Sequence, residues 1–210
     1  MELHIIAHAH NGFSQKFGIP RQSREDSLIE TRIIFTPEFR IREALRGIEE
    51  YSHLWLIWGF HEAIRRDGNE TTSDRWTPTV RPPRLGGNKR MGVFATRSPF
   101  RPNPIGLSCV KLDSIEETEK YGTVLKVKGA DLMDGTPIFD IKPYLPYTDC
   151  RNDATGGFAE PLRDYALEVV FPEELLHKIP KEQHKAIIAV LENDPRPSYQ
   201  NDCERVYGLT

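Results

Sequence analysis

The stretch His53-Leu54-Trp55-Leu56-Ile57-Trp58-Gly59-Phe60 is apolar almost throughout and ends at the polar pair His61-Glu62. Apolar residues follow one another in it without the apolar–polar alternation of a half-exposed strand. Such a run is typical of a β-strand that is buried on both faces. We therefore expect a strand here, in the interior of the fold.

Shorter apolar runs on both sides of this stretch predict further strands. Because the strands outnumber the helices and no strand–helix–strand alternation appears, a closed or half-closed antiparallel β-barrel fits better than a doubly wound sheet. The expected strands cover residues 3–9, 31–35, 91–96, 105–115 and 123–132, with 116–122 as a turn.

Helical patterns are few. Thr36-Pro37-Glu38 combines a capping hydroxyl, a first-turn proline and an acid, and apolar residues at helical spacing continue to Tyr51. A polar, glycine-containing linker over 148–158 separates a second region, where we expect a strand over 166–171 and a helix over 181–192. The predicted fold is mainly β: an antiparallel β-barrel domain over residues 1–150 and a small α+β C-terminal subdomain over 151–210.

Composition narrows the class of protein. The sequence of 210 residues has no apolar run of the roughly 20 residues that a membrane-spanning helix needs. Its N-terminus does not resemble a signal peptide. The three cysteines are an odd number and lie far apart, which argues against a disulfide scaffold and a zinc ribbon. We expect a cytoplasmic protein without a membrane segment.

Charge is distributed unevenly along the chain. Residues 75–104 contain seven Lys and Arg residues and no Asp or Glu, so the other residues sum to −10 in a chain whose net charge is −3. Six of the sixteen prolines lie in the same window. The segregation predicts a local anionic partner, of which phosphate is the commonest; a solvated basic loop is the alternative.

Polar residues that could carry chemistry gather in four places. Arg and Gln side chains in a proline-stiffened loop can bind a carboxylate or phosphate, and tyrosines beside a lysine can stack bases and contact phosphates. The four places are Pro20-Arg21-Gln22, Phe60-His61-Glu62, Thr96–Ser108 and Asp131–Asp149. The alternative for Thr96–Ser108 is a structural, proline-rich corner, and the alternative for Asp131–Asp149 is ordinary turn chemistry.

Two of these places carry a resemblance. Arg101-Pro102-Asn103-Pro104-Ile105-Gly106-Leu107-Ser108 and Asp134-Gly135-Thr136-Pro137-Ile138-Phe139-Asp140-Ile141-Lys142-Pro143-Tyr144 closely resemble the TsaA-like (TrmO) family over residues 3–149. Residues 194–197 and 205–208 are similar to the C-terminal region of its bacterial members. Since the chain stops at Thr210, we expect that C-terminal subdomain to be incomplete.

The resemblance implies a β-barrel methyltransferase that uses S-adenosylmethionine as its methyl donor. Its substrate would be the threonylcarbamoyl-modified adenosine just 3′ of the anticodon in tRNA, methylated on N6. The family also implies a homodimer, with the cofactor bound near the subunit contact. The cofactor contacts carried over by motif are Pro20, Arg21, Gln22, His61, Glu62, Arg97, Leu107, Asp134, Gly135, Thr136 and Pro137.

For the reaction itself we expect in-line methyl transfer assisted by a general base, because the attacking nitrogen is delocalised and carries a proton. Asp140 is the first candidate for that base and His61 the second. We expect Tyr144 and Tyr147 to stack on the adenine, and Lys142 and Arg101 to bind phosphate or the threonyl carboxylate.

Two other functions remain open from the residues. The basic window and the tyrosines also suit a tRNA-binding module without catalysis, which would need no cofactor pocket. His8, His10 and His61 could instead hold a metal ion in a metal-dependent hydrolase, although no carboxylate or cysteine motif accompanies them.

Overall fold

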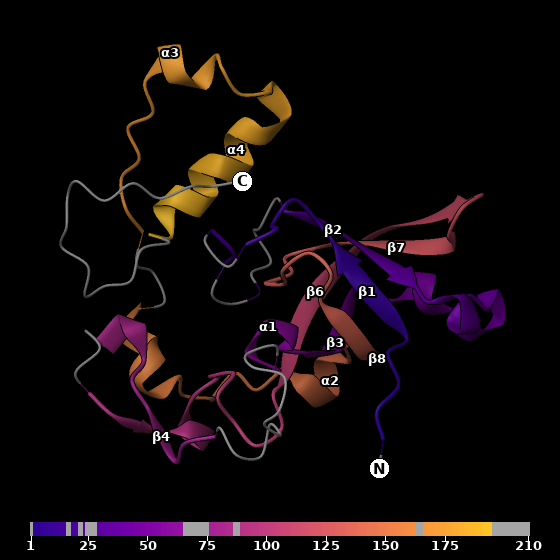
Figure 1. Ribbon diagram of the computed structural model, residues 1–210, viewed down its shortest axis with the longest axis horizontal. Helices are drawn as coiled ribbons and strands as arrows, with labels where there is room; N and C mark the ends of the chain where they lie inside the picture. The colour runs from indigo at the N-terminus through magenta and orange to yellow at the C-terminus, as the bar shows by residue number, and fades with distance from the viewer. Residues whose placement is uncertain are drawn as a thin grey trace.

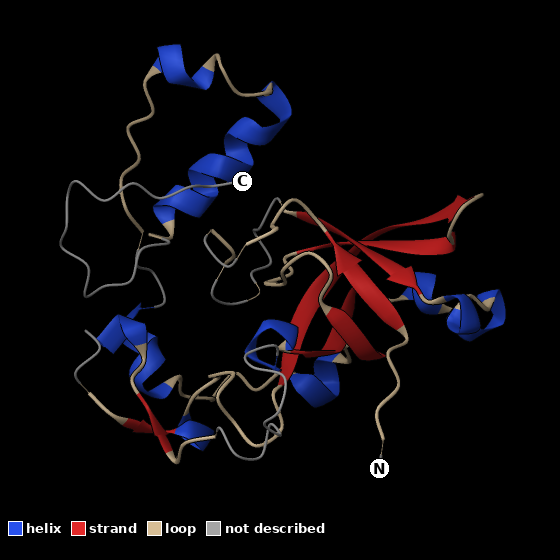
Figure 2. Ribbon diagram, in the orientation of Figure 1, coloured by secondary structure: helices blue, strands red, loops and turns tan. Residues whose placement is uncertain are grey.

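The computed structural model describes residues 2–15, 18–20, 23, 29–64, 76–85, 89–162 and 166–194. Within these residues no helix is both long and apolar enough to cross a membrane. Figures 1 and 2 show one large twisted sheet, with the short strand β4 (Thr79–Val80) apart from it. The prediction of a mainly β fold is confirmed.

Six strands form an antiparallel sheet in the order β1-β2-β7-β6-β3-β8. The first and last strands of this order also pair, Ala7 opposite Ile138, so that hydrogen bonding returns to its starting strand. The strands are β1 (Ala7–His10), β2 (Glu30–Phe35), β3 (His53–Gly59), β6 (Ile105–Thr118), β7 (Gly122–Lys128) and β8 (Pro137–Pro143).

The core lies on one face of this sheet. Alternate residues of β3 are buried, Leu54 and Leu56 completely, and they join Ile33, Leu125 and Ile138 in one apolar cluster. The residues between them, such as Trp55, are only half-buried. The expectation that β3 is buried on both faces is therefore wrong, because its outer face is covered only in part.

The predicted helix up to Tyr51 is replaced by three 3-10 turns. They are η1 (Pro37–Phe39), η2 (Arg42–Leu45) and η3 (Ile48–Glu50). Gly47 adopts φ 86°, a left-handed conformation that ends any continuous helix between η2 and η3. Phe39, Leu45 and Ile48 still pack against the core, so the apolar pattern was real but not helical.

Other boundaries differ in both directions. Residues 137–143 form β8, which was expected to be loop, whereas no strand forms over 166–171. The strand expected over 91–96 ends at once: β5 (Met91–Gly92) pairs with β4 (Thr79–Val80) and is followed by η6 (Val93–Ala95). The remaining short helices are α1 (His61–Ile64), η5 (Pro83–Leu85), α2 (Pro146–Asp149), η7 (Gly157–Leu162) and α3 (Glu173–Leu176).

The helix α4 (Lys181–Glu192) has the bounds predicted for it. A hydrogen bond joins the end of this helix to an earlier part of the subdomain: Leu167 N–H donates to Glu192 O over 2.8 Å. In the described part of residues 151–210 all regular elements are helical, so the strand that made this subdomain α+β is not found there.

Candidate functional site

A pocket of about 620 Å³ opens at the end of the sheet where β3 finishes and β6 begins. Its walls come from four segments that are distant in sequence. They contribute Ile19 and Pro20, then Trp58, Gly59, Phe60, His61 and Glu62, then Arg97, Pro99, Arg101, Asn103, Ile105, Gly106 and Leu107, and finally Asp131, Met133 and Thr136. A volume of this size suits a nucleoside-sized ligand.

One wall is held by a chain of three polar groups. Trp58 Nε1 donates to Ser108 Oγ over 2.9 Å, and the Ser108 hydroxyl donates in turn to a carboxylate oxygen of Asp131. Ser108 is fully buried, and its hydroxyl has a protein partner both as acceptor and as donor, as buried polar groups generally do. Burial raises the pKa of Asp131, against the lowering effect of the Ser108 hydrogen bond and the Arg97 charge.

Two glycines of the pocket lining make room for neighbouring aromatic side chains. Gly106 lies opposite Trp58 in the β3–β6 ladder, and a Cβ on it would lie 2.2 Å from Trp58 Cε2. A Cβ on Gly59 would lie 2.8 Å from the Phe139 ring. The indole of Trp58 therefore lies directly over the Gly106 backbone, and its ring meets that of Phe60 edge-on at 4.3 Å.

The proline-rich segment before β6 forms a compact, locally bonded loop. The Arg101 guanidinium donates to Thr96 O over 3.1 Å, and Phe60 N–H donates to Pro104 O over 2.9 Å. These bonds join the loop both to itself and to the end of β3. Arg97 and Arg101 are thereby brought to the pocket, as a ligand clamp would require.

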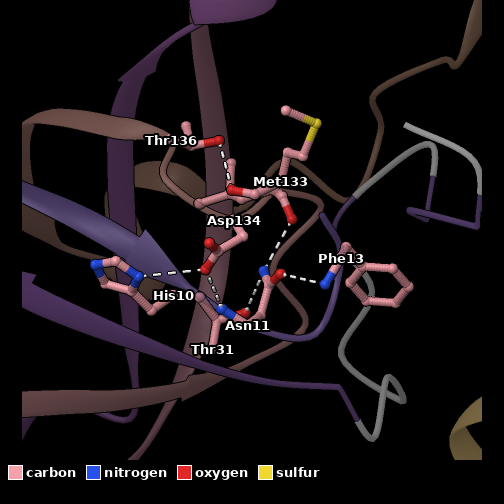
Figure 3. A network of polar contacts seen from close by, with 8 residues as sticks. His10, Asn11, Phe13, Thr31, Met133, Asp134 and Thr136 are labelled. Atoms are coloured by element: carbon pink, nitrogen blue, oxygen red, sulfur yellow. Dashed lines mark hydrogen bonds and ion pairs between the residues drawn. The ribbon is translucent and has the colours of Figure 1, made fainter. Parts of the chain in front are cut away.

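The turn before β8 reaches the same pocket through Met133 and Thr136. Asp134 is turned toward β1: its carboxylate accepts from Asn11 N–H over 3.1 Å and lies 3.2 Å from His10 Nδ1 (Figure 3). Thr136 is buried and donates from Oγ1 to Met133 O over 2.7 Å. Gly135 takes φ 76°, which turns the chain back so that Thr136 O accepts from Ala9 N–H.

The cofactor residues predicted from the sequence are thus only partly brought together. Those that line the pocket are Pro20, His61, Glu62, Arg97, Leu107 and Thr136. Asp134, Gly135 and Pro137 belong to the adjoining turn but are not among the lining residues. Arg21 and Gln22 lie outside the described residues.

The predicted substrate and base residues divide in the same way. Arg101 and His61 line the pocket, and the His61 ring lies 3.8 Å from the Glu62 carboxylate. The others, Asp140, Lys142, Tyr144 and Tyr147, are not among the lining residues. Together with the neighbouring Asp149 they form what we call the β8–α2 patch.

Contacts within the β8–α2 patch are mostly local. Lys142 Nζ lies 2.9 Å from an Asp140 carboxylate oxygen, and Tyr147 is 83% exposed. Asp149 accepts from Trp55 Nε1 over 3.0 Å and from Leu145 N–H over 2.8 Å, and these bonds lower its pKa. Desolvation raises the pKa of Tyr144, whose ring leans on Trp55.

The three histidines considered as metal ligands take different neighbours. His10 faces Asp134 and His61 faces Glu62, and burial lowers the pKa of His8. Among the described residues no group of three or more His, Cys, Asp or Glu side chains could hold a metal ion.

Sequence reasoning missed Trp58 and Asp131 as pocket residues. Trp58 was assigned to a buried strand, and Asp131 to the start of a polar loop. A signal was present for Trp58, since the glycine of the Ile105-Gly106-Leu107 motif leaves space that a large side chain must fill. Nothing local marks Asp131, whose partner Ser108 is 23 residues away.

A family model described as the tRNA-methyltransferase O N-terminal domain matches residues 8–150, and one described as the TrmO C-terminal domain matches residues 164–210. A tRNA (adenine(37)-N6)-methyltransferase of Escherichia coli (strain K12) is 41% identical over 194 residues, which cover 90% of this chain and 79% of the relative.

Two further matches agree with these. A tRNA (adenine(37)-N6)-methyltransferase of Eikenella corrodens is 48% identical over 160 residues, 76% of this chain and 85% of the relative. A crystal structure of TrmO from Pseudomonas aeruginosa superposes with a TM-score of 0.68 at 32% identity, covering 93% of this chain and 82% of that one.

Proposed function

This chain belongs to the tRNA-methyltransferase O family, and from that membership we propose that it transfers a methyl group from S-adenosylmethionine to N6 of adenosine 37 in tRNA. The observation that carries the proposal is the family match over residues 8–150, the part of the chain that builds the pocket. The relatives are named as methyltransferases, which favours an enzyme over a tRNA-binding module or a hydrolase.

The lining of the pocket fits S-adenosylmethionine chemically. Arg97 can bind its carboxylate, and Glu62 can accept from ribose hydroxyls or from the α-ammonium group. Leu107 and Ile105 offer an apolar wall for the adenine ring. When bound, the cofactor supplies a methyl group on a cationic sulfur, an electrophile that needs little further activation.

The chain's own residues then position the reactants and accept a proton. N6 of the substrate loses a hydrogen as its bond to the methyl carbon forms. We place His61 as the acceptor, because it lines the pocket and its neighbour Glu62 can stabilise the imidazolium that results. Asp140 remains the other predicted base, but it does not line the pocket and faces Lys142.

For the substrate we propose the threonylcarbamoyl-modified adenosine. Arg101 would bind the threonyl carboxylate, since its guanidinium lines the pocket beside Arg97. Lys142, Tyr144 and Tyr147 would contact the tRNA outside the pocket.

The proposal also covers the fold, the cellular location and the oligomeric state. The closed pairing order of the six strands supports a small β-barrel over residues 1–150, followed by a subdomain over 151–210. The free thiols of Cys109 and Cys150 are consistent with a cytoplasmic protein. A homodimer with the pocket near the subunit contact follows from the family resemblance, and sedimentation would test it.

The decisive experiment is mass spectrometry of nucleosides from tRNA incubated with the protein and isotopically labelled S-adenosylmethionine. We expect a labelled methyl group on the threonylcarbamoyl nucleoside. Labelling of unmodified adenosine 37 would keep the methyltransferase and remove the substrate preference. Absence of label together with heat of cofactor binding in calorimetry would contradict the proposed reaction.

A further inference from the structure

Two aromatic side chains lie on the surface outside the pocket lining. Trp76 is 40% exposed and Phe94 is 73% exposed. Their ring centroids are 6.4 Å apart and the ring planes differ by only 25°. A single exposed ring is common on protein surfaces, but two nearly parallel ones form a joint apolar face. We call Trp76 and Phe94 the aromatic pair.

The backbone holds the aromatic pair at one end of a two-stranded sheet. Thr79 of β4 lies opposite Gly92 of β5, and beyond them Val93 N–H donates to Pro78 O over 3.0 Å. In the turn η6 that follows, Val93 is only 2% exposed, whereas its neighbour Phe94 lies on the surface. The exposure of Phe94 is therefore a consequence of an ordered turn.

Cations flank the other end of the same two strands. Arg81 and Arg90 adjoin the pair formed by Val80 and Met91, and both are exposed, as is Lys89. Arg90 Nη1 donates to Thr79 Oγ1 over 2.8 Å, which holds the guanidinium along β4. Arg81 follows Thr79 by two residues and Arg90 precedes Gly92 by two, so each backbone position lies about 7 Å along its strand from the Thr79–Gly92 pair, at a rise of about 3.3 Å per residue.

The charges and rings together specify the chemistry of a partner. No acidic residue occurs between Arg75 and Pro104, so an anionic ligand meets no repulsion from this segment. An unpaired RNA strand offers flat base faces for the rings and phosphates for the cations. A second copy docking on the same face would add the cations of its own segment, which has no acidic residue to balance them.

The aromatic pair also lies close to the pocket along the chain. Phe94 precedes Arg97, a pocket-lining residue, by three positions, which span at most about 10 Å. A strand that leaves the pocket can therefore reach the aromatic pair within a few nucleotides.

We propose that the aromatic pair stacks on unpaired bases of the tRNA loop while Arg81, Lys89 and Arg90 bind the neighbouring phosphates. This inference rests on the proposed function, because it says where the RNA around the methylated adenosine lies. It assigns to β4, η6 and the residues beside them a role in substrate recognition.

Intrinsic fluorescence tests the contact directly, because Trp76 is the exposed member of the three tryptophans. Titration with a synthetic RNA stem–loop that carries an unpaired adenosine in its loop is expected to quench the emission. In Trp76→Phe the quenching disappears, while binding of the same fluorescently labelled RNA stays nearly unchanged because a stacking ring is retained. Equal quenching in Trp76→Phe would overturn the contact.

Affinity measurements on Phe94 variants test the energy of stacking. Phe94→Ala is expected to weaken stem–loop binding by about 5- to 100-fold, the range found for loss of one base–aromatic contact. Phe94→Tyr, which keeps the ring, retains the affinity. The control is Tyr51→Ala, which removes a partly exposed ring (38%) that lies neither in the aromatic pair nor in the pocket lining and is expected to have no effect.

The contribution of charge is read from salt dependence. Arg90→Gln is expected to reduce the slope of log affinity against log salt by about one unit. Unchanged RNA affinity in Phe94→Ala, or a change in the sedimentation of the free protein, would overturn the proposal; the latter would indicate contacts between copies.

The proposed function is tested separately with the unaltered protein. A protein that methylates tRNA but keeps its RNA affinity in Phe94→Ala contradicts the surface alone. Quenching of Trp76 by RNA without methyl transfer contradicts the enzyme alone.

Discussion

The pocket and the β8–α2 patch differ in how their polar groups are assembled. Asp131 in the pocket accepts from Ser108 of β6, 23 residues away, and Ser108 accepts in turn from Trp58 Nε1 of β3. In the β8–α2 patch, Lys142 pairs with Asp140 two residues away on the same strand, and Tyr147 stands 83% exposed. The residues of the patch are close together in the sequence, so the sequence alone pointed to them. The residues of the pocket come together only in the folded chain.

The same contrast appears in two aspartates. Desolvation raises the pKa of Asp131, while hydrogen bonds from Leu145 N–H and Trp55 Nε1 lower that of Asp149. Burial thus has the larger effect on the pocket acid, and hydrogen-bond donors have the larger effect on the patch acid. Four measurements test the difference between the regions.

The largest effect is expected from Gly106→Ala. The new Cβ would lie 2.2 Å from Trp58 Cε2, so the indole or the strand must move. Overpacking of this kind costs about 1–3 kcal/mol, and we expect S-adenosylmethionine affinity to fall by about tenfold or more as the pocket wall shifts. Chemical denaturation and calorimetry measure the two effects.

The control for this substitution is Gly92→Ala on β5, where a Cβ would meet nothing within 4 Å. We expect its free energy of unfolding to stay within about 0.5 kcal/mol of the unaltered protein. If Gly106→Ala were equally silent, Trp58 would not be confined as described.

Ser108→Ala comes next. It leaves Trp58 Nε1 without its acceptor and removes a donor from Asp131, a loss we expect to cost about 1–3 kcal/mol. Ser114→Ala, on an exposed position of the same strand, serves as the control. Similar unfolding free energies for both variants would show that the chain of three polar groups does not stabilise the pocket.

A smaller, opposed pH dependence is expected from the two aspartates. Because burial raises the folded-state pKa of Asp131, the folded protein keeps its proton to a higher pH than the unfolded chain. Its contribution to stability therefore falls as pH rises from the ordinary carboxyl pKa to the raised value. For Asp149 the folded pKa is lowered, so its contribution is complete above the ordinary value and is lost as pH falls through the folded one.

Asp131→Asn and Asp149→Asn separate these terms in unfolding experiments across pH. The difference from the unaltered protein should shift in opposite directions for the two variants. Parallel shifts would contradict the assignment of burial to one acid and hydrogen bonding to the other.

The smallest effect is expected from Tyr147→Ala. Since this side chain is 83% exposed and does not line the pocket, stability should change by less than about 0.5 kcal/mol and cofactor affinity should stay the same. Calorimetry with S-adenosylmethionine checks this. A clear loss of cofactor affinity would join the patch to the pocket, while a loss of RNA affinity alone would support its predicted substrate role.

Local sequence patterns predicted a helix or strand correctly where hydrophobic spacing and the turn-forming residues agreed. The apolar face of α4 and its proline stop placed that helix at Lys181–Glu192. The signals failed where two properties competed. Prolines at both ends of β8 concealed a strand whose register is set by β1 and β3, and the apolar spacing before Tyr51 concealed the turn at Gly47.

The candidate site shows the same limit. The motifs at Arg97–Leu107 and at Thr136 were found, because proline, glycine and arginine in close succession restrict both backbone and chemistry. Asp131 was not singled out, because an aspartate at the start of a turn looks the same whether it is solvated or buried beneath Ser108.

The amino-acid sequence alone determined the strand-rich character of this protein, the segregation of its positive charge and the motifs it shares with its family, since each depends on residues close together in the chain. Tertiary structure decided which polar side chains share a pocket. The physical reason is strand register: it places Gly106 against Trp58, and a shift of one residue would turn every side chain of the strand to the other face.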